Sequence, residues 1–215
     1  MNAVLTLKIA LLLILAYLIG SFPTGYLVGK FFFHKDIRKI GSGNTGATNT
    51  FRTCGPVAGI FVLIVDVLKG TLGSILPVIF HLGLPHYWVL IYGIAAIIGH
   101  TFSIFLKFHG GKAVATSAGI LLGYNPVFFG WCAVIFFPIL FITSTVSLSS
   151  LISVVLIFIL SFWFHDWILT VVMFGIMVLL FVRHHANIKR LEHKEESIMP
   201  FGLYYWYKQK HPKQH

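Results

Sequence analysis

Long apolar runs are the feature that most limits what this chain can fold into. Seven of them follow one another along 215 residues, with few charged side chains inside them. A helix needs about 20 mostly apolar residues to cross the hydrocarbon core of a bilayer, and a chain built this way has too little polar surface to cover a soluble core. The runs span residues 3–33, 57–80, 87–106, 113–123, 127–142, 148–164 and 167–182.

The composition indicates the same class of protein. Hydrophobic residues make up 57% of the chain and charged residues only 10%, against about 25% charged residues in soluble domains. The first run is far longer than the apolar part of a secretory signal and has no convincing cleavage site, so we expect it to remain as the first span. We predict one integral membrane domain, residues 1–190, followed by a basic and aromatic cytoplasmic tail, residues 191–215.

The predicted fold is all-α, a polytopic membrane bundle of about seven helices. The run at 113–123 is too short to cross alone, because at about 1.5 Å per residue it reaches about 16 Å in a core about 30 Å thick. It must be re-entrant or lie where the membrane is thinned. Most Lys and Arg residues follow the first, third and last spans, and the loops at 81–86, 124–126 and 165–166 contain none. The positive-inside rule then predicts an outside N-terminus and a cytoplasmic C-terminus.

The net charge of +10 does not indicate nucleic-acid binding. The basic residues have neither an aromatic platform nor a helix-turn-helix context, and membrane topology explains them better. The two cysteines, Cys54 and Cys132, support neither a disulfide framework nor a zinc site.

The richest polar segment is residues 41–52, which follow the first span. Gly41, Gly43 and Gly46 match a G-x-G-x-x-G pattern, but the flanks are membrane spans rather than a strand and a crossover helix, so the match is weak evidence for a dinucleotide site. We predict instead that backbone N–H groups of this loop converge on an anion, with Arg52 as a bidentate phosphate donor. The further hydrogen-bonding side chains are Ser42, Asn44, Thr48 and Asn49. The alternative is a flexible interhelical turn, which seldom contains so many polar residues.

The second polar segment, residues 108–116, presents Lys112 after Gly110 and Gly111 at the start of the short helix. Helix N-terminal N–H groups and an ammonium together attract phosphate, so we predict a second phosphate-binding element here. It is not a Walker A loop, since Ala113 follows the lysine. Taken alone, Lys112 is equally compatible with a charge that only sets topology.

The third polar segment, residues 183–190, follows the last span. His184 and Asn187 are three residues apart and so share a helix face. Histidine can donate or accept a proton near neutral pH, whereas His184 and His185 make a poor metal site without a carboxylate or cysteine beside them. No metal site is therefore predicted. The alternative for this segment is a basic juxtamembrane anchor.

Asp66, Lys69 and His100 are ionisable residues inside the second and third apolar runs. Asp66 and Lys69 are three residues apart in the second run, where such residues are functional or paired by default. Pairing with each other and direct contact with a substrate fit the sequence equally well. We interpret His100, which follows Gly99 in the third run, as an interior histidine with satisfied hydrogen bonds rather than a catalytic residue.

Together these segments resemble the bacterial acyl-phosphate-dependent glycerol-3-phosphate acyltransferases, the PlsY family, from near Gly20 to Arg190. Residues 41–52, 110–116 and 184–187 are similar to three family motifs, and shorter similarities occur at 21–26, 36–38 and 66–70. One departure is Ala113, where glycine is the commoner residue in the family.

The resemblance implies transfer of a fatty acyl group from acyl phosphate to the 1-hydroxyl of glycerol 3-phosphate. The products would be lysophosphatidic acid and phosphate, in the first acylation of phospholipid biosynthesis. It implies a seven-helix bundle in the bacterial cell membrane with a cytoplasmic active site and no cofactor. The implied partners are the two substrates, membrane lipid and the soluble enzyme that makes acyl phosphate, and no nucleic acid.

The resemblance also assigns roles to particular residues. The implied catalytic residues are Ser42, Arg52, Lys112, His184 and Asn187. The implied substrate- and phosphate-binding residues are Gly41, Gly43, Asn44, Gly46, Thr48, Asn49, Gly110 and Gly111.

This chemistry fits the residues, because acyl phosphate is a mixed anhydride and a hydroxyl can attack it without a protein nucleophile. Positioning and charge stabilisation then suffice, and the hydroxyl proton can pass to His184 or to the substrate's own phosphate. The alternative is a transporter of an organophosphate anion, which predicts an inverted repeat and ligands near the membrane midplane. Neither is visible in the sequence, and a purely structural scaffold leaves residues 41–52 unexplained.

Overall fold

All regular secondary structure in the described part of the chain is helical. The structure is a computed structural model, and it describes residues 3–211, in which no strand occurs. The elements are α1 (Ala3–Ser21), α2 (Thr24–Phe32), α3 (Ala47–Cys54), α4 (Pro56–Ser74), α5 (Leu76–Ile79), α6 (Trp88–Thr101), the 3₁₀ helix η1 (Ile104–Leu106), α7 (Val114–Tyr124), α8 (Pro126–Thr143), α9 (Val146–Ser161), the 3₁₀ helix η2 (Phe162–Phe164), α10 (Trp167–Arg183), α11 (His185–Glu192) and α12 (Leu203–Lys210).

The helix lengths confirm the predicted membrane bundle. Within residues 3–211, five helical segments are long and apolar enough to cross a membrane, and the pair α10 and α11, bent by 58°, makes a sixth if it counts as one span. With the short apolar helix α7, these give the predicted set of about seven. The helices form two compact units, one up to Phe128 and one from Phe129 onward.

The first predicted span, residues 3–33, is two helices rather than one. α1 ends at Ser21 and α2 begins at Thr24, because Pro23 between them has no N–H to donate and its ring blocks the preceding turn. The Thr24 N–H donates to the carbonyl of Phe22 over 3.0 Å, which closes the break as a tight turn. The chain therefore bends before the nine-residue α2 begins.

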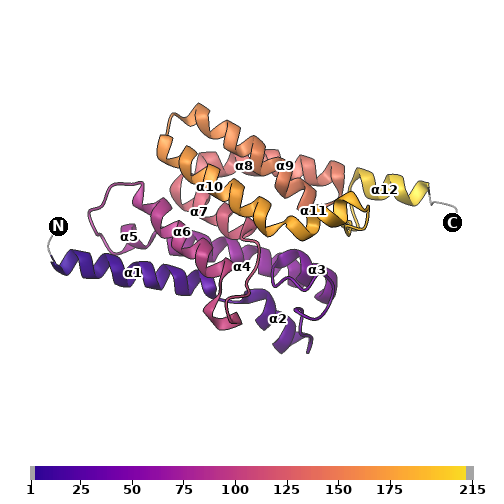
Figure 1. Ribbon diagram of the computed structural model, residues 1–215, viewed down its shortest axis with the longest axis horizontal. Helices are drawn as coiled ribbons and strands as arrows, with labels where there is room; N and C mark the ends of the chain where they lie inside the picture. The colour runs from indigo at the N-terminus through magenta and orange to yellow at the C-terminus, as the bar shows by residue number, and fades with distance from the viewer. Residues whose placement is uncertain (1–2, 212–215) are drawn as a thin grey trace. The chain divides into compact units, whose positions relative to one another are not determined.

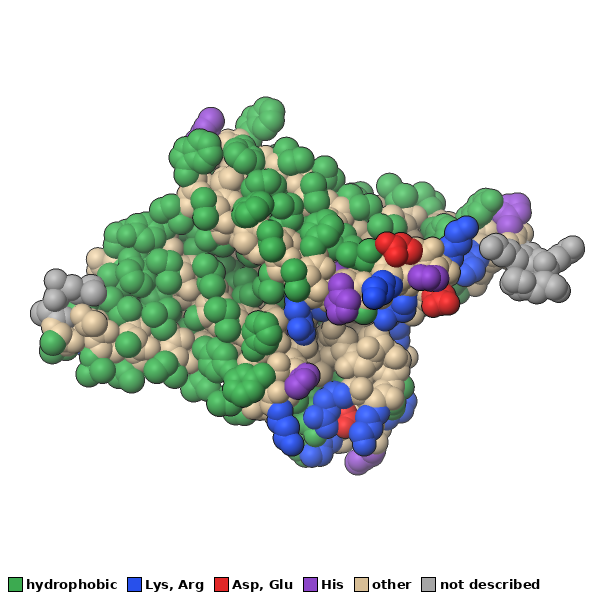
Figure 2. Space-filling model, in the orientation of Figure 1, with side chains coloured by type: hydrophobic (Ala, Val, Ile, Leu, Met, Phe, Trp, Pro, Cys, Tyr) green, Lys and Arg blue, Asp and Glu red, His purple; other side chains and the backbone are tan. Residues whose placement is uncertain are grey.

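The outward faces of the first unit are apolar. Much of α1 is exposed, and among its large exposed apolar side chains some recur every three or four residues as a stripe along the helix. Figure 2 shows this hydrophobic cover, with Lys and Arg side chains of the unit gathered over α2 and the loop after it. A lipid-facing surface explains both observations, since so large an apolar face would not stay exposed in water. The stripe on α1 is formed by Val4, Leu7, Leu11 and Ile14.

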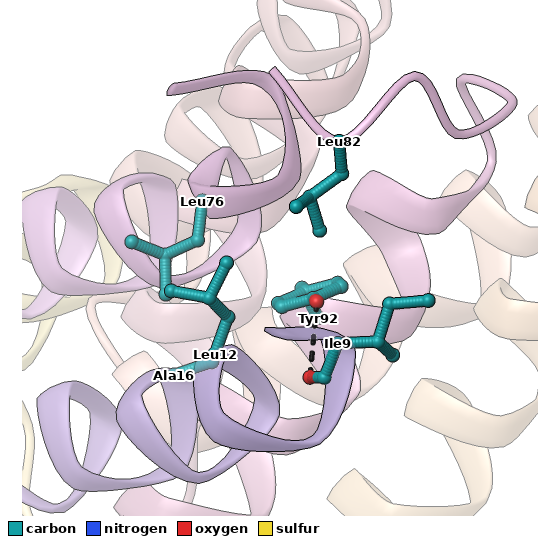
Figure 3. Packing of buried hydrophobic residues seen from close by; sticks show 6 residues of the cluster. All are labelled: Ile9, Leu12, Ala16, Leu76, Leu82 and Tyr92. Atoms are coloured by element: carbon teal, nitrogen blue, oxygen red, sulfur yellow. Dashed lines mark hydrogen bonds between the residues drawn. The ribbon is translucent and has the colours of Figure 1, made fainter. Parts of the chain in front are cut away.

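α1, α4, α6 and α7 pack side by side in the first unit (Figure 1). At the end of this unit near the N-terminus, buried side chains of α1 meet Leu76, Leu82 and Tyr92 (Figure 3). Tyr92 is fully buried, and its hydroxyl donates to the carbonyl of Ile9 over 3.1 Å, so the phenol is satisfied inside the apolar cluster.

The short helix α7 is built against α4. It has 11 residues, as the sequence predicts for an element that cannot cross alone. A methyl group at Gly119 would overlap the carbonyl of Val67, and one at Gly70 would overlap the carbonyl of Thr116, so the two backbones are in direct contact. The Thr71 hydroxyl adds a hydrogen bond to the carbonyl of Gly119, 2.8 Å long. Close approach through small residues is the usual way in which helices associate in lipid.

The second unit contains most of α8 and the helices from α9 to α12. Asp166 caps α10 by accepting hydrogen bonds from the N–H groups of Ile168 and Leu169. The described part of the predicted tail folds back onto Ser144, just after α8. The Met199 N–H donates to the carbonyl of Ser144 over 2.6 Å, and the Tyr205 N–H donates to the Ser144 hydroxyl over 3.0 Å. Residues 212–215 of that tail lie outside the described residues.

Candidate functional site

The first polar loop is held in shape by its own asparagines. Asn49 is buried, and its amide nitrogen donates to the carbonyls of Ile37 (2.8 Å) and Ile40 (3.1 Å). Its amide oxygen accepts from the Ser42 N–H over 3.0 Å, and the Asn44 side chain accepts from the Gly46 N–H over 2.9 Å. The predicted role of these asparagines in phosphate binding stays a prediction, but the structure shows that both also close the loop.

Two of the loop glycines have backbone conformations that favour glycine. Gly41 and Gly43 have φ angles of +63° and +70°, which other residues rarely adopt. A methyl group at Gly41 would also overlap the amide oxygen of Asn49. Gly46 is different, because it begins α3 as an extended N-cap residue.

The loop leads into α3, which carries Arg52. This helix packs closely on α4, since a methyl group at Gly59 would approach the Phe51 side chain to 2.5 Å. Arg52 and Thr48 on α3 are half-buried and Ser42 in the loop is exposed. The predicted role of Ser42, Thr48 and Arg52 in binding phosphate stays a prediction.

The second polar loop lies on the end of α6. The Gly110 N–H donates to the carbonyl of Thr101 and the Gly111 N–H to the carbonyl of His100, both over 3.0 Å. Lys112 follows, half-buried, and Ala113 precedes α7 with a left-handed φ of +63°. That conformation gives a physical reason why glycine would suit position 113.

Asp66 and Lys69 form a buried ion pair inside the first unit. The Lys69 ammonium lies 2.7 Å from Asp66 Oδ1, and both side chains are less than a tenth exposed. Lys69 also donates to the carbonyl of Phe22 over 2.9 Å, and the Thr24 hydroxyl donates to Asp66 over 3.1 Å. The pairing that the sequence left open is therefore present. Its other partners come from the α1–α2 break, which sequence reasoning did not connect to it.

His100 is buried beside this pair, with its Nδ1 atom 4.0 Å from Asp66 Oδ1. Asp66, Lys69 and His100 line one small cavity of about 10 Å³, and Thr45 from the first polar loop lines it too. A cavity of this size is at the lower limit for holding one water molecule. The cluster therefore lies between the two polar loops of the first unit.

In the second unit, His184 and Asn187 are both buried at the start of α11. His184 Nδ1 lies 2.8 Å from the carbonyl of Leu180. A carbonyl can only accept, so Nδ1 carries the ring proton in the neutral imidazole and Nε2 is its basic nitrogen. His185, by contrast, is exposed.

Glu196 is the residue of this region that sequence reasoning missed. Its side chain is 3% exposed, and its carboxylate accepts hydrogen bonds from Arg190 (2.7 Å), Asn187 (2.9 Å) and Ser147 (3.0 Å). Burial works to raise the pKa of Glu196, but the hydrogen bonds from Arg190 and Asn187 outweigh it and hold the pKa below its ordinary value. Ser147 is 49 residues from Glu196 in the sequence, so the sequence does not indicate that the two residues meet. The one local signal is the excess of cations around Glu196, which favours a carboxylate partner.

These features define the class of protein. Apolar helices of membrane-spanning length, with cation-bearing polar loops at their ends, make the chain an integral membrane protein with candidate anion-binding elements.

Comparison with known proteins identifies the family. The sequence profile described as glycerol-3-phosphate acyltransferase matches residues 10–194. A glycerol-3-phosphate acyltransferase 2 of Lactobacillus johnsonii is 68% identical, covering 96% of this chain and 94% of its own, and a glycerol-3-phosphate acyltransferase of Latilactobacillus sakei is 54% identical, covering 95% and 98%. The chain belongs to the glycerol-3-phosphate acyltransferase family, a family of acyltransferases.

Solved structures agree with this membership. The crystal structure of PlsY, described as an integral membrane glycerol 3-phosphate acyltransferase in its glycerol 3-phosphate form, is 30% identical with a TM-score of 0.82 and covers 89% of this chain and 96% of its own. Its lysophosphatidic acid form is 29% identical with a TM-score of 0.79, covering 89% and 95%. The predicted all-helical membrane fold and the predicted family are thereby confirmed.

Proposed function

We propose that this protein transfers a fatty acyl group from acyl phosphate to the 1-hydroxyl of glycerol 3-phosphate, giving lysophosphatidic acid and inorganic phosphate. The reaction takes place at the cytoplasmic face of the bacterial cell membrane. The observation that carries the proposal is the pair of polar loops in the first unit. The first leads to the half-buried Arg52 and the second to the half-buried Lys112, and the chain belongs to this family. Both proposed substrates are phosphate-bearing anions, which such cations recognise.

The chemistry needs no protein nucleophile. The hydroxyl oxygen of glycerol 3-phosphate attacks the acyl carbon, the new ester C–O bond forms, and the bond between that carbon and the phosphate oxygen breaks. Ser42, Arg52 and Lys112 stabilise the charge that develops on the phosphate and the acyl oxygen. The hydroxyl proton passes to His184 Nε2, the basic nitrogen of that ring, or to a phosphate oxygen. An acyl adduct on Ser42 or Cys54 of protein mixed with acyl phosphate alone, seen by mass spectrometry, would contradict this direct route.

The test is acylation by the purified protein in detergent, with an acyl phosphate and labelled glycerol 3-phosphate. We expect labelled lysophosphatidic acid from the wild type, and a loss of about 10²-fold or more in turnover for Arg52→Ala and Lys112→Ala, the usual effect of removing one preorganised charge-stabilising donor. Lys107→Ala removes an exposed lysine five residues before Lys112 and is the matched control, with turnover near wild type.

Two results would contradict the proposal. Folded Arg52→Ala or Lys112→Ala protein that keeps half of the wild-type rate would remove that residue from the site. Counterflow of labelled glycerol 3-phosphate into proteoliposomes, without acylation in detergent, would favour the organophosphate transporter instead.

A further inference from the structure

The imidazole of His100 is the surface on which the second polar loop rests. His100 lies in the last turn of α6 and is 8% exposed. Its carbonyl accepts the Gly111 N–H over 3.0 Å. A methyl group added to Gly111 would overlap the Nε2 atom of the same imidazole. Both the backbone and the ring of His100 therefore touch the residue that immediately precedes Lys112.

The two glycines of this loop are needed for space rather than for an unusual backbone angle. Neither Gly110 nor Gly111 is among the residues with positive φ. A methyl group at Gly110 would overlap the carbonyl of His100 and approach the carbonyl of Thr101 to 2.9 Å, and both are backbone atoms. At Gly111 the nearest atoms all belong to the His100 ring. The two neighbouring glycines thus face different parts of the same end of α6.

The other edge of the ring faces the buried ion pair. His100 Nδ1 lies 4.0 Å from Asp66 Oδ1, and Asp66 is itself fixed by Lys69 at 2.7 Å and by the Thr24 hydroxyl at 3.1 Å. The ring therefore lies between Asp66 of α4 and the loop, and Thr24 of α2 helps to fix Asp66. A side chain confined on both edges can hold the loop in one place.

We propose that His100 is a positioning residue for the acyl transfer. Its ring sets the position of the Gly111 backbone, and through it the position of the Lys112 ammonium. This inference rests on the proposed function, in which Lys112 binds phosphate. The role is one of shape, so it does not require His100 to touch a substrate or to exchange a proton. Small displacements of a charge-stabilising group are enough to slow an enzyme about 10²-fold.

A double-mutant cycle tests the inference, with kcat and KM for glycerol 3-phosphate measured separately. We expect His100→Ala to lower kcat/KM at least about tenfold, because the loop loses its support. We expect Gly111→Ala to be impaired as well, because its methyl group overlaps the ring. In His100→Ala/Gly111→Ala that methyl group occupies the space left by the ring, so the double variant should be no worse than the poorer single variant.

Gly110→Ala is the matched control. Its methyl group meets backbone atoms, which His100→Ala does not remove, so the effects of Gly110→Ala and His100→Ala should multiply. A fold defect alone would give the same outcome for both glycines, whereas the inference requires different outcomes. If His100→Ala does not fold, the same cycle is measured with His100→Asn.

The failure of this inference differs from the failure of the proposed function. Wild-type kcat/KM in His100→Ala, or multiplying effects with both glycines, would overturn the inference while Lys112→Ala still lowered turnover about 10²-fold or more. Wild-type activity in Lys112→Ala would instead remove Lys112 from the site and overturn the proposed function.

Discussion

Asn49 is buried, and its amide joins three backbone groups of the first polar loop. It can do so only because Gly41 leaves room beside its amide oxygen and adopts a left-handed backbone angle. The glycine pattern that first suggests a phosphate loop is thus also a requirement of the loop's internal hydrogen bonds. Residues with such a double role are sensitive to the smallest substitution.

We therefore expect Gly41→Ala to lower acylation at least about tenfold, since the methyl group displaces Asn49 and with it the loop that carries Ser42. Gly46→Ala is the matched change in the same loop. Its φ angle is not in the left-handed region, and its methyl group would lie 3.2 Å from Asn44 Oδ1, a smaller overlap than the one at Gly41, so we expect a smaller loss. Kinetics of both variants measure the difference, and equal losses would contradict this account of Gly41.

At the scale of the elements, Glu196 joins the residues that follow α11 to α9 and to α11 itself. Its partners are Ser147 on α9 and Asn187 and Arg190 on α11. The carboxylate must be ionised to accept from all three at once. Because its folded-state pKa is depressed, it contributes stability that is present above its unfolded-state pKa and is lost as the pH falls through its folded-state pKa.

Glu196→Gln should therefore lower the free energy of unfolding by about 2 kcal/mol at neutral pH, the scale of a hydrogen-bonded buried charge. The difference from wild type should shrink as the pH falls below the ordinary value of 4.5. The midpoint of thermal unfolding in detergent, followed across pH, measures it. Glu195→Gln is the control, because it removes the same charge from the preceding residue, which is exposed. A pH-independent difference would contradict the role of the ionised carboxylate.

The contact between α4 and α7 gives a second expectation at this scale. Gly119→Ala should lower the free energy of unfolding by about 1–3 kcal/mol, because overpacking of a tight contact forces backbones apart. Gly175→Ala adds the same methyl group to α10, where no atom lies within 4 Å, and should leave thermal unfolding unchanged. Equal midpoints for the two variants would show that the helices can separate without loss.

The elements could be predicted from the sequence where the signal is local. Apolar length predicted the spans and the short α7, and glycine-rich polar segments marked both loops of the first unit. Three features escaped because they depend on contacts between distant residues: the α1–α2 break supplies Phe22 and Thr24 to the Asp66–Lys69 pair, His100 supports Gly111, and Glu196 binds Ser147. A sequence pattern does not encode which distant residue fills a given space.

At the scale of the whole molecule, α4 is long enough to separate two loops across a membrane. This helix has 19 residues and so spans about 28 Å at 1.5 Å per residue. The basic loop around Lys39 lies toward one end of it, beside α3, while the loop at 81–86 follows its other end. We therefore propose that the two loops lie on opposite sides of the membrane, and the positive-inside rule predicts that the basic one faces the cytoplasm.

Labelling of single cysteines tests that orientation, in a protein with Cys54 and Cys132 replaced by alanine. Lys39→Cys and Pro85→Cys both place the thiol at an exposed position. We expect an impermeant reagent added outside intact cells to label the second and not the first. Labelling of both from the same side would contradict the predicted topology.

The close contact of α7 with α4 also imposes an order on how the protein is made. α7 follows α4 in the chain, so the growing polypeptide has already delivered α4 to the bilayer when α7 emerges from the ribosome. A segment of 11 residues with buried hydroxyls at Thr116 and Ser117 gains too little from lipid alone to enter by itself. Packing against α4, rather than its own hydropathy, then holds α7 in the membrane. A defect in α4 would therefore remove the packing partner that α7 needs in the membrane.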